Sequence, residues 1–148
     1  MILKRVAVIL LLVSSLTFAN AAVYTWQCAS NDLWSNAACW TNGDLDDAGD
    51  DMVLALSQVV TMDDDRDVKG FTISAGILSI TSGDTLGLNN AHSTLSGTGT
   101  VIVDGDITFA NNNKDITVTS QFTWNSGTIS GQGTCCTAQR GLVVLWSI

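Results

Sequence analysis

A short turn sequence recurs in this chain at a fixed interval, whereas the apolar segments between the turns differ in sequence. SGDTLGLNN at residues 82–90 returns as DGDITFANN at residues 104–112, and Ser126-Gly127-Thr128-Ile129 opens the phrase a third time after an equal step. We call this step, from 82 to 104 to 126, the turn interval. A turn that recurs in this way, between segments of differing sequence, is typical of a solenoid whose corners stack on one another. Each side of such a coil needs only some apolar residue that points inward, so its sequence is free to vary.

Short segments with alternating apolar residues follow one another over residues 59–134. Gly, Ser, Asn or Asp separates nearly every pair of segments, and a period of two with one apolar face predicts half-buried strands. One unit of strand plus corner, taken three times, gives the turn interval. The same unit taken twice gives a shorter step, the side interval, which joins apolar positions in two series: Phe71, Leu86, Val101, Ile116 and Ile73, Leu88, Val103, Val118. The sequence therefore predicts an all-β fold, a right-handed parallel β-solenoid of about three coils, each of roughly 22 residues.

An antiparallel β-sandwich also produces short strands at close spacing and is the alternative architecture. The phrase TLSGTGT, which begins at residue 94, returns as TISGQGT at residue 128, a step that fits neither interval. The regular turn interval favours the solenoid. It also predicts two columns along the axis: an amide ladder of Asn89 over Asn111, and an edge formed by Gly83, Gly105 and Gly127.

Residues 1–21 have the three parts of a secretory signal peptide. Lys4 and Arg5 form a basic start, residues 6–13 an apolar run, and Ala19-Asn20-Ala21 a small-residue cleavage site. The apolar run is too short to span a bilayer. We therefore expect a secreted or cell-surface protein that does not span the membrane once this leader is cleaved.

Without its leader the chain is strongly acidic. Four basic residues remain against fourteen Asp, a net charge of −10, and the sequence contains neither Glu nor Pro. Abundant Thr, Ser, Gly, Asn, Val and Ile are typical of short strands joined by tight turns. So acidic a chain repels phosphate groups, and we expect no nucleic-acid partner.

Residues 22–58 form a Trp-rich segment before the repeats, with Trp26, Trp34 and Trp40 close together in sequence. A solenoid has an apolar coil end that must be covered, so one interpretation is that these rings cap that end. The alternative is a glycan-binding platform, in which Trp26, Trp34, Trp40 and Trp124 offer flat faces to sugar rings.

Cys28 and Cys39 flank this Trp-rich loop, and we expect a disulfide between them in an oxidising compartment. The adjacent Cys135 and Cys136 leave two alternatives open, pairing outside the chain or remaining free thiols. A zinc site is not expected, because the cysteine spacings do not suit one and the sequence has a single histidine.

YTWQCASNDLWSNAACW at residues 24–40, then AGDDMVL at residues 48–54, then short Gly- and Thr-rich strands, resembles the start of large secreted β-helix proteins. These are the autotransporter-passenger-like and other cell-surface β-solenoid repeat proteins. The resemblance extends over about residues 23–134 and is compositional. It implies a surface, adhesive or scaffold role and brings no catalytic residue. The chain departs from these proteins at Leu45-Asp46-Asp47, where Pro often precedes the AGDD-like segment, and in its small number of coils.

Residues 135–148 break the repeat pattern. CCTAQRGLVVLWSI replaces the inward-facing strand expected after Gly133-Thr134. The segment LVVLW suits a final strand but would leave an apolar edge. We expect this tail to reflect truncation or a frame shift in a longer protein.

Carboxylates are the plentiful reactive groups of the sequence. Clustered Asp oxygens suit Ca²⁺, which makes Ca²⁺ the one candidate cofactor. Neither of the two clusters has the EF-hand spacing, and a solvated acidic loop is the commoner outcome. The candidate calcium ligands are Asp63, Asp64, Asp65 and Asp67, and the second cluster is Asp44, Asp46, Asp47, Asp50 and Asp51.

Catalysis has weaker support in the sequence. Asp84 and Asp106 would stack one coil apart, at about the 5 Å that separates the carboxyl groups of a retaining glycosidase. His92 beside Ser93 is no triad, because a nucleophile needs a base and an orienting group placed by the fold. We expect a non-enzymatic module with a structural or adhesive role toward cell-surface or matrix components. The alternative is a carbohydrate-active module that binds glycans or, as the weaker form, cleaves them as a lyase or hydrolase.

Overall fold

The computed structural model describes residues 21–45, 47–89, 92–110, 115–138 and 144–146. The predicted leader lies outside these residues except for Ala21, and so do Asp46 and Asn111. The predictions of a signal peptide and of a ladder from Asn89 to Asn111 therefore stay predictions.

The regular secondary structure of the described chain consists almost entirely of strands, and these strands pair in parallel. Parallel pairing joins segments far apart in sequence, such as Leu86 with Ile107 and Ile107 with Ile129. The predicted parallel β-solenoid is confirmed, with about 4 turns, and the antiparallel sandwich is wrong. The strands are β1 Val23–Thr25, β2 Asp32–Leu33, β3 Asp47–Leu54, β4 Val59–Thr61, β5 Arg66–Ile73, β6 Ile77–Ile80, β7 Thr85–Leu88, β8 Ser93–Leu95, β9 Thr100–Val103, β10 Asp106–Phe109, β11 Asp115–Val118, β12 Gln121–Trp124, β13 Ile129–Gly131, β14 Thr134–Ala138 and β15 Val144–Trp146, with a 3-10 helix η1 at Ala37–Cys39.

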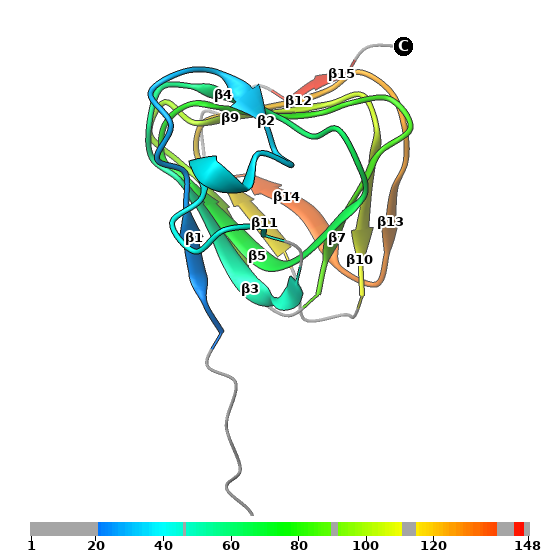
Figure 1. The fold of residues 1–148 in the computed structure, drawn as a ribbon. Coiled ribbons are helices and arrows are strands. Elements are labelled where there is room, and N and C mark those ends of the chain that lie inside the picture. Colours follow the sequence, from blue (N-terminus) through cyan, green and yellow to red (C-terminus); the bar gives the residue numbers. More distant parts are fainter. Residues whose placement is uncertain (1–20, 46, 90–91, 111–114, 139–143, 147–148) are drawn as a thin grey trace, which may run out of the picture.

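The strands enclose the core with three faces, which Figure 1 shows in a view along the axis. Face A consists of β1, the second halves of β3 and β5, β8, β11 and β14. Face B consists of β2, β4, β6, β9, β12 and β15. Face C consists of the first half of β5, β7, β10 and β13.

β5 belongs to two of these faces. Its first residues, Arg66 to Val68, pair with β7, whereas Thr72 and Ile73 pair with β8. The chain thus turns the corner between faces C and A without leaving the strand conformation, which joins the two faces into one nine-stranded sheet.

The core lies inside the three faces and is apolar. Alternation along each strand sends every second side chain inward, as in the buried–intermediate pattern of β9 and β10. Full burial of one such side chain stabilises the fold by roughly 1.5–3 kcal/mol. The alternation along the strands predicted fourteen inward residues, and all but Trp124, which is half-buried, are buried. The buried ones are Phe71, Ile73, Leu78, Ile80, Leu86, Leu88, Val101, Val103, Ile107, Phe109, Ile116, Val118 and Phe122.

The two sequence intervals have the structural meaning assigned to them. Thr72 pairs with Thr94, which lies one turn interval later in the chain and one full coil away. Phe71, Leu86 and Val101, which are separated by the side interval, lie on faces A, C and B. Each side interval therefore covers two sides of the coil.

One predicted column is only partly formed. The pairing of Ile107 with Ile129 places Gly105 opposite Gly127, and a Cβ on Gly127 would lie 1.8 Å from the carbonyl oxygen of Gly105. The pairing of Thr85 with Asp106 places Asp84, not Gly83, opposite Gly105. The prediction was wrong for Gly83 because the step from β7 to β10 is one position shorter than the turn interval.

The solenoid begins earlier than residue 59 and continues past residue 134. β1 pairs with β3 and β2 pairs with β4, so the Trp-rich segment already contributes strands to faces A and B. At the other end β14 and β15 extend the sheets, and β15 lies within the LVVLW segment. The additional strands explain why the structure has more turns than the sequence predicted.

Candidate functional site

The three tryptophans of the Trp-rich segment are buried together at one end of the solenoid. Trp26, Trp34 and Trp40 are 1%, 0% and 2% exposed. The Trp40 ring centroid lies 5.0 Å from that of Trp26 and 5.2 Å from that of Trp34. Rings closed to solvent have no face to offer a sugar, so this placement fits the capping interpretation and does not support a glycan platform.

Polar contacts fix two of the three rings within this cap, whereas the buried Nε1 of Trp26 has no hydrogen-bond partner in the described part of the chain. Trp34 Nε1 donates to the Leu45 carbonyl at 3.0 Å, and Trp40 Nε1 donates to the Trp34 carbonyl at 2.8 Å. The predicted disulfide between Cys28 and Cys39 is confirmed, with a Cα–Cα distance of 4.9 Å. Because the backbone N–H of Gln27 also donates to the Cys39 carbonyl at 2.8 Å, the disulfide and the hydrogen bond together hold the cap loop closed.

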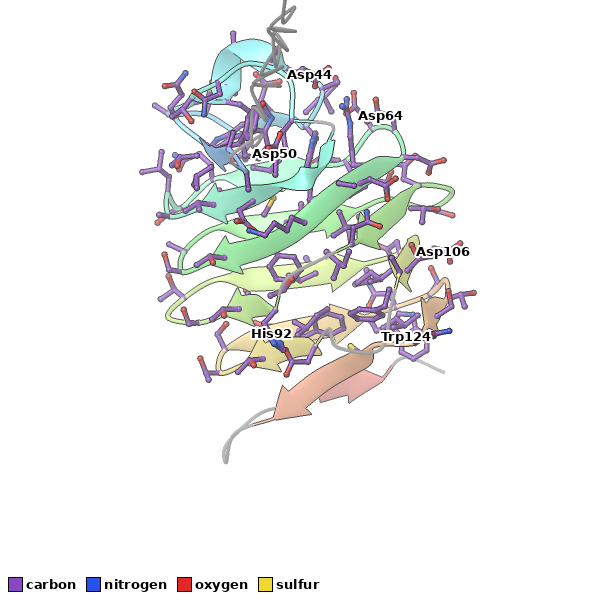
Figure 2. All side chains as sticks on the ribbon, turned by 90° about the horizontal axis from the view of Figure 1, so that it is seen from below. Asp44, Asp50, Asp64, His92, Asp106 and Trp124 are labelled. Carbon is purple, nitrogen blue, oxygen red and sulfur yellow. A yellow bond between two sulfur atoms is a disulfide. The ribbon has the colours of Figure 1, made fainter. Side chains whose placement is uncertain are left out.

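Trp124 does not join these three rings. It ends β12 on face B, is half-buried, and packs against the core. Its Nε1 donates to the Ser126 carbonyl at 2.6 Å. Figure 2 shows Trp124 near the opposite end of the stack from the cap. The four predicted glycan-binding tryptophans therefore do not form one surface.

The remaining cysteines are partly described. Cys135 is also disulfide-bonded, and the described cysteines include no free thiol. The side chain of Cys136 lies outside the described residues. Of the two alternatives for this pair, the free thiol does not hold for Cys135.

Two of the four candidate calcium ligands are directed toward the cap. Asp63 Oδ1 accepts from the backbone N–H of Ser35 at 3.1 Å and Oδ2 accepts from its hydroxyl at 2.6 Å. Asp64 accepts from Arg66, with Nε 2.6 Å from Oδ1 and Nη2 2.8 Å from Oδ2. Both carboxylates are thus engaged with protein donors.

The other two candidate ligands are directed along face C. Asp65 Oδ1 accepts from the backbone N–H of Thr85 at 2.7 Å, and Asp67 Oδ1 accepts from Asn89 Nδ2 at 3.2 Å. Among the described residues, Cys28, Asp32 and Cys39 form a group of three potential metal ligands whose ligand atoms lie within 4.8 Å of one another. The two cysteines of this group are joined in the disulfide. The calcium prediction therefore has no geometric support from a converging set of carboxylates.

Arg66 is a buried charge that sequence reasoning did not single out. Its side chain is 5% exposed, and Nη1 lies 3.0 Å from Asp44 Oδ1, beside the contact with Asp64. Nη1 also donates to the Leu45 carbonyl at 3.4 Å. A buried guanidinium needs such partners, since desolvation of an unpaired charge is costly. Asp44 and Asp64 lie near the cap in Figure 2.

The second acidic cluster contributes to the edge of face A. Asp50 is 9% exposed, and its Oδ1 accepts from the backbone N–H of Ala22 at 2.8 Å. Asp51 pairs with Lys69 of the next coil, with Nζ 2.8 Å from Oδ2. These carboxylates tie neighbouring coils together.

The two carboxylates considered for glycosidase chemistry have different structural partners. Asp106 Oδ1 accepts from the backbone N–H of Thr128 at 2.6 Å. Asp84 Oδ2 accepts from the hydroxyl of Thr81, within its own turn. Because Thr85, and not Asp84, pairs with Asp106, the two carboxylates do not occupy one register position.

His92 and Ser93 each contact a residue of a neighbouring coil and do not contact each other as a catalytic pair. His92 Nδ1 contacts Asp115 Oδ1 at the exposed edge of face A. Ser93 is fully buried, and its Oγ accepts from the backbone N–H of Phe71 at 3.1 Å.

A shallow recess of about 270 Å³ lies at the edge of face C, lined by Asp65, Arg66, Asp67 and Thr85. Gly87 leaves room for the Asp67 side chain of this recess, because a Cβ on Gly87 would lie 1.7 Å from Asp67 Oδ1. The recess presents carboxylate and hydroxyl oxygens on an open surface.

No family model, curated protein or solved structure matches this chain. In the part of the chain that the structure describes, no helix has the length and apolar character needed to cross a membrane.

Proposed function

We propose that this chain is a secreted or cell-surface β-solenoid module with a structural and adhesive role. The observation that supports this proposal is the use made of the outward carboxylates. Asp63, Asp65 and Asp106 each accept a backbone N–H from a neighbouring coil. Carboxylates used in this way link one coil to the next and so stabilise the stack, which is a role suited to a scaffold.

The disulfide between Cys28 and Cys39 supports the proposed location. Disulfides persist in oxidising compartments and are rare in the cytosol. Together with the signal peptide expected at residues 1–21, this pairing favours export of the protein.

Glycan binding is the second candidate function, and the recess on face C favours it. Carboxylate and hydroxyl oxygens at Asp65, Asp67 and Thr85 are suitable acceptors for sugar hydroxyl groups. Substitution Asp67→Asn with glycan-array binding as the readout tests this candidate. Loss of a glycan signal in that variant would support the recess as a binding site.

The main proposal is tested by assay of purified residues 22–148 against plant and microbial polysaccharides, with and without Ca²⁺. We expect no release of reducing ends or unsaturated products. Cleavage that disappears in Asp84→Asn or Asp106→Asn would overturn the non-enzymatic proposal. A cell-surface or matrix pull-down with the same material is expected to retain the protein.

A further inference from the structure

Face A carries a column of threonines in direct register. Thr72 pairs with Thr94, and Thr94 pairs with Thr117. Thr137 takes the next register position after Thr117. Thr72, Thr94 and Thr117 occupy outward positions, since the neighbouring Ile73, Leu95 and Val118 are buried in the core. Successive coils therefore present the same β-branched side chain at one level of the face.

A second hydroxyl column runs beside the first. It consists of Ser74, Ser96 and Thr119, which lie two residues after Thr72, Thr94 and Thr117. Their backbone N–H groups continue the hydrogen-bond ladder between coils. Ser96 N donates to the Ile73 carbonyl at 2.8 Å, and Thr119 N donates to the Leu95 carbonyl at 2.8 Å. We call the two columns together the hydroxyl grid: Thr72, Ser74, Thr94, Ser96, Thr117 and Thr119.

Thr72 and Ser74 of the grid are exposed, and Thr94, Ser96 and Thr117 are half-buried. In the described part of the chain the side chains of Thr72, Ser74, Thr94, Ser96 and Thr117 make no hydrogen bond to protein, whereas Thr119 Oγ1 donates to the Leu95 carbonyl at 3.2 Å. This contrasts with the carboxylates of face C, which are engaged by neighbouring coils. The grid thus has free hydroxyls on a fixed backbone.

The hydroxyl grid contains no charged side chain. The ion pair of Asp51 with Lys69 and the contact of His92 with Asp115 lie at the margin of the grid toward face C. Neither of the other faces repeats this pattern in its described residues. The comparable column of face C reads Asp67, Gly87, Thr108, Ser130, and that of face B reads Thr61, Ser79, Ile102, Thr123.

The spacing of the grid follows from sheet geometry. Neighbouring strands are about 4.8 Å apart, which sets the spacing of Thr72, Thr94 and Thr117 along the first column. Ser74, Ser96 and Thr119 directly follow the ends of β5, β8 and β11. Threonine is stiff at χ1, so hydroxyl and methyl groups in one column form straight rows. The first column therefore offers hydroxyl and methyl groups from Thr72, Thr94 and Thr117, and the serines of the second column add hydroxyls without methyl groups.

We propose that the hydroxyl grid of face A binds the surface of ice. The repeat along the solenoid is close to the shortest repeat of oxygen positions in hexagonal ice, and a hydroxyl both donates to and accepts from a lattice water. The methyl groups exclude unordered water from the contact, and the lack of charge avoids hydration shells that do not fit the lattice. The rigid parallel stack keeps the rows in place before contact, which lowers the entropic cost of binding.

This inference rests on the proposed adhesive role and names the partner of one face. It also accounts for the difference between the faces, because in the described columns face A alone has a threonine on three successive coils.

The test uses purified, oxidised residues 22–148 that carry a fluorescent label, and it measures the fraction taken up by a slowly growing ice hemisphere and the arrest of ice-crystal growth. The central substitution is Thr94→Lys, and the matched control is Thr108→Lys on face C. We expect uptake of the parent protein and of the control, with loss on the order of tenfold for Thr94→Lys, because the centre of a contact dominates its binding energy. Thr94→Val keeps the shape and loses one hydroxyl, and it should fall between the two.

Circular dichroism and thermal unfolding of each variant separate loss of binding from loss of fold. The proposal is overturned if the parent protein enters ice no more than a labelled protein of similar size, or if both lysine variants behave alike. Binding to crystalline cellulose or chitin that is sensitive to Thr94→Lys, without ice uptake, would overturn the ice assignment and leave the adhesive role standing. Polysaccharide cleavage would instead remove the proposed function itself, so the two failures are distinguishable.

Discussion

The backbone N–H of Thr128 donates to Asp106 Oδ1 at 2.6 Å, and the two residues belong to successive coils. The N–H of Thr85 makes the same contact with Asp65 Oδ1 at 2.7 Å, two coils earlier on the same corner. Regular ladder pairing ends at the corners, where a backbone donor would otherwise lack a protein partner. Aspartate supplies the missing acceptor from the coil next to it.

We expect Asp106→Ala to lower the free energy of unfolding by about 1–2 kcal/mol, since it removes an ionised acceptor from a backbone donor. Asp106→Asn keeps an acceptor oxygen and should lose less. Urea denaturation followed by circular dichroism measures both values. Asp104→Ala is the matched control in the same turn, and an equal loss in that variant would show that Asp106 has no bracing role.

Gly127 and Gly83 should respond differently to alanine. Both have positive φ, of 79° and 97°, and an L-residue in that region costs about 1–2 kcal/mol. A Cβ on Gly83 meets nothing within 4 Å, but one on Gly127 would lie 1.8 Å from the Gly105 carbonyl oxygen. Gly127→Ala should therefore destabilise the fold clearly more than Gly83→Ala. Similar urea midpoints for the two variants would contradict the stacking of Gly105 on Gly127.

The cap should depend on its disulfide. The link from Cys28 to Cys39 has a sequence separation of 11, and closing a loop of about this length stabilises a fold by roughly 2–3 kcal/mol. We expect the double variant Cys28→Ser with Cys39→Ser to unfold at lower temperature and to lose part of its near-ultraviolet tryptophan signal. Peptide mapping without reductant should recover the linked peptide from the parent protein, and free thiols at both positions would refute the pairing.

Trp34→Ala should unfold the cap and not merely remove a surface ring. The side chain is fully buried and hydrogen-bonded to Leu45, and truncation of a buried tryptophan costs about 3–5 kcal/mol. Acrylamide quenching of the parent protein should leave a strongly shielded tryptophan population. A stable, fully folded Trp34→Ala variant with lost glycan binding would instead identify this residue as a sugar contact.

The coils were predictable because their signal is periodic and local. Alternating apolar residues, such as Val101 and Val103 or Ile107 and Phe109, predict which side of a strand faces the core. The turn interval predicts that successive coils stack on one another. The first coil was not recognised as part of the repeat. The step from Val23 to its partner Asp51 is longer than the turn interval, because the interposed cap loop hides the period.

The roles of the polar residues were less predictable. A run such as Asp63 to Asp67 suggests a metal site in sequence, yet the direction of each carboxylate depends on which coil passes beside it. The hydroxyl grid was also missed, since the step from Thr94 to Thr117 is one position longer than the step from Thr72 to Thr94. A search for the pattern Thr-x-Ser or Thr-x-Thr with a variable interval would have found it.

The sequence distance between paired strands varies from coil to coil, and this variation has a consequence for how such a protein evolves. The step from Val59 to its partner Ile77 is clearly shorter than the step from Ile77 to its partner Thr100, and yet inward and outward positions keep their order on face B. Differences in length are thus absorbed between the strands and do not shift the pattern that each strand presents. Insertions and deletions at the corners are therefore tolerated changes, and a foreign peptide placed there should be displayed at the rim while every face keeps its alignment.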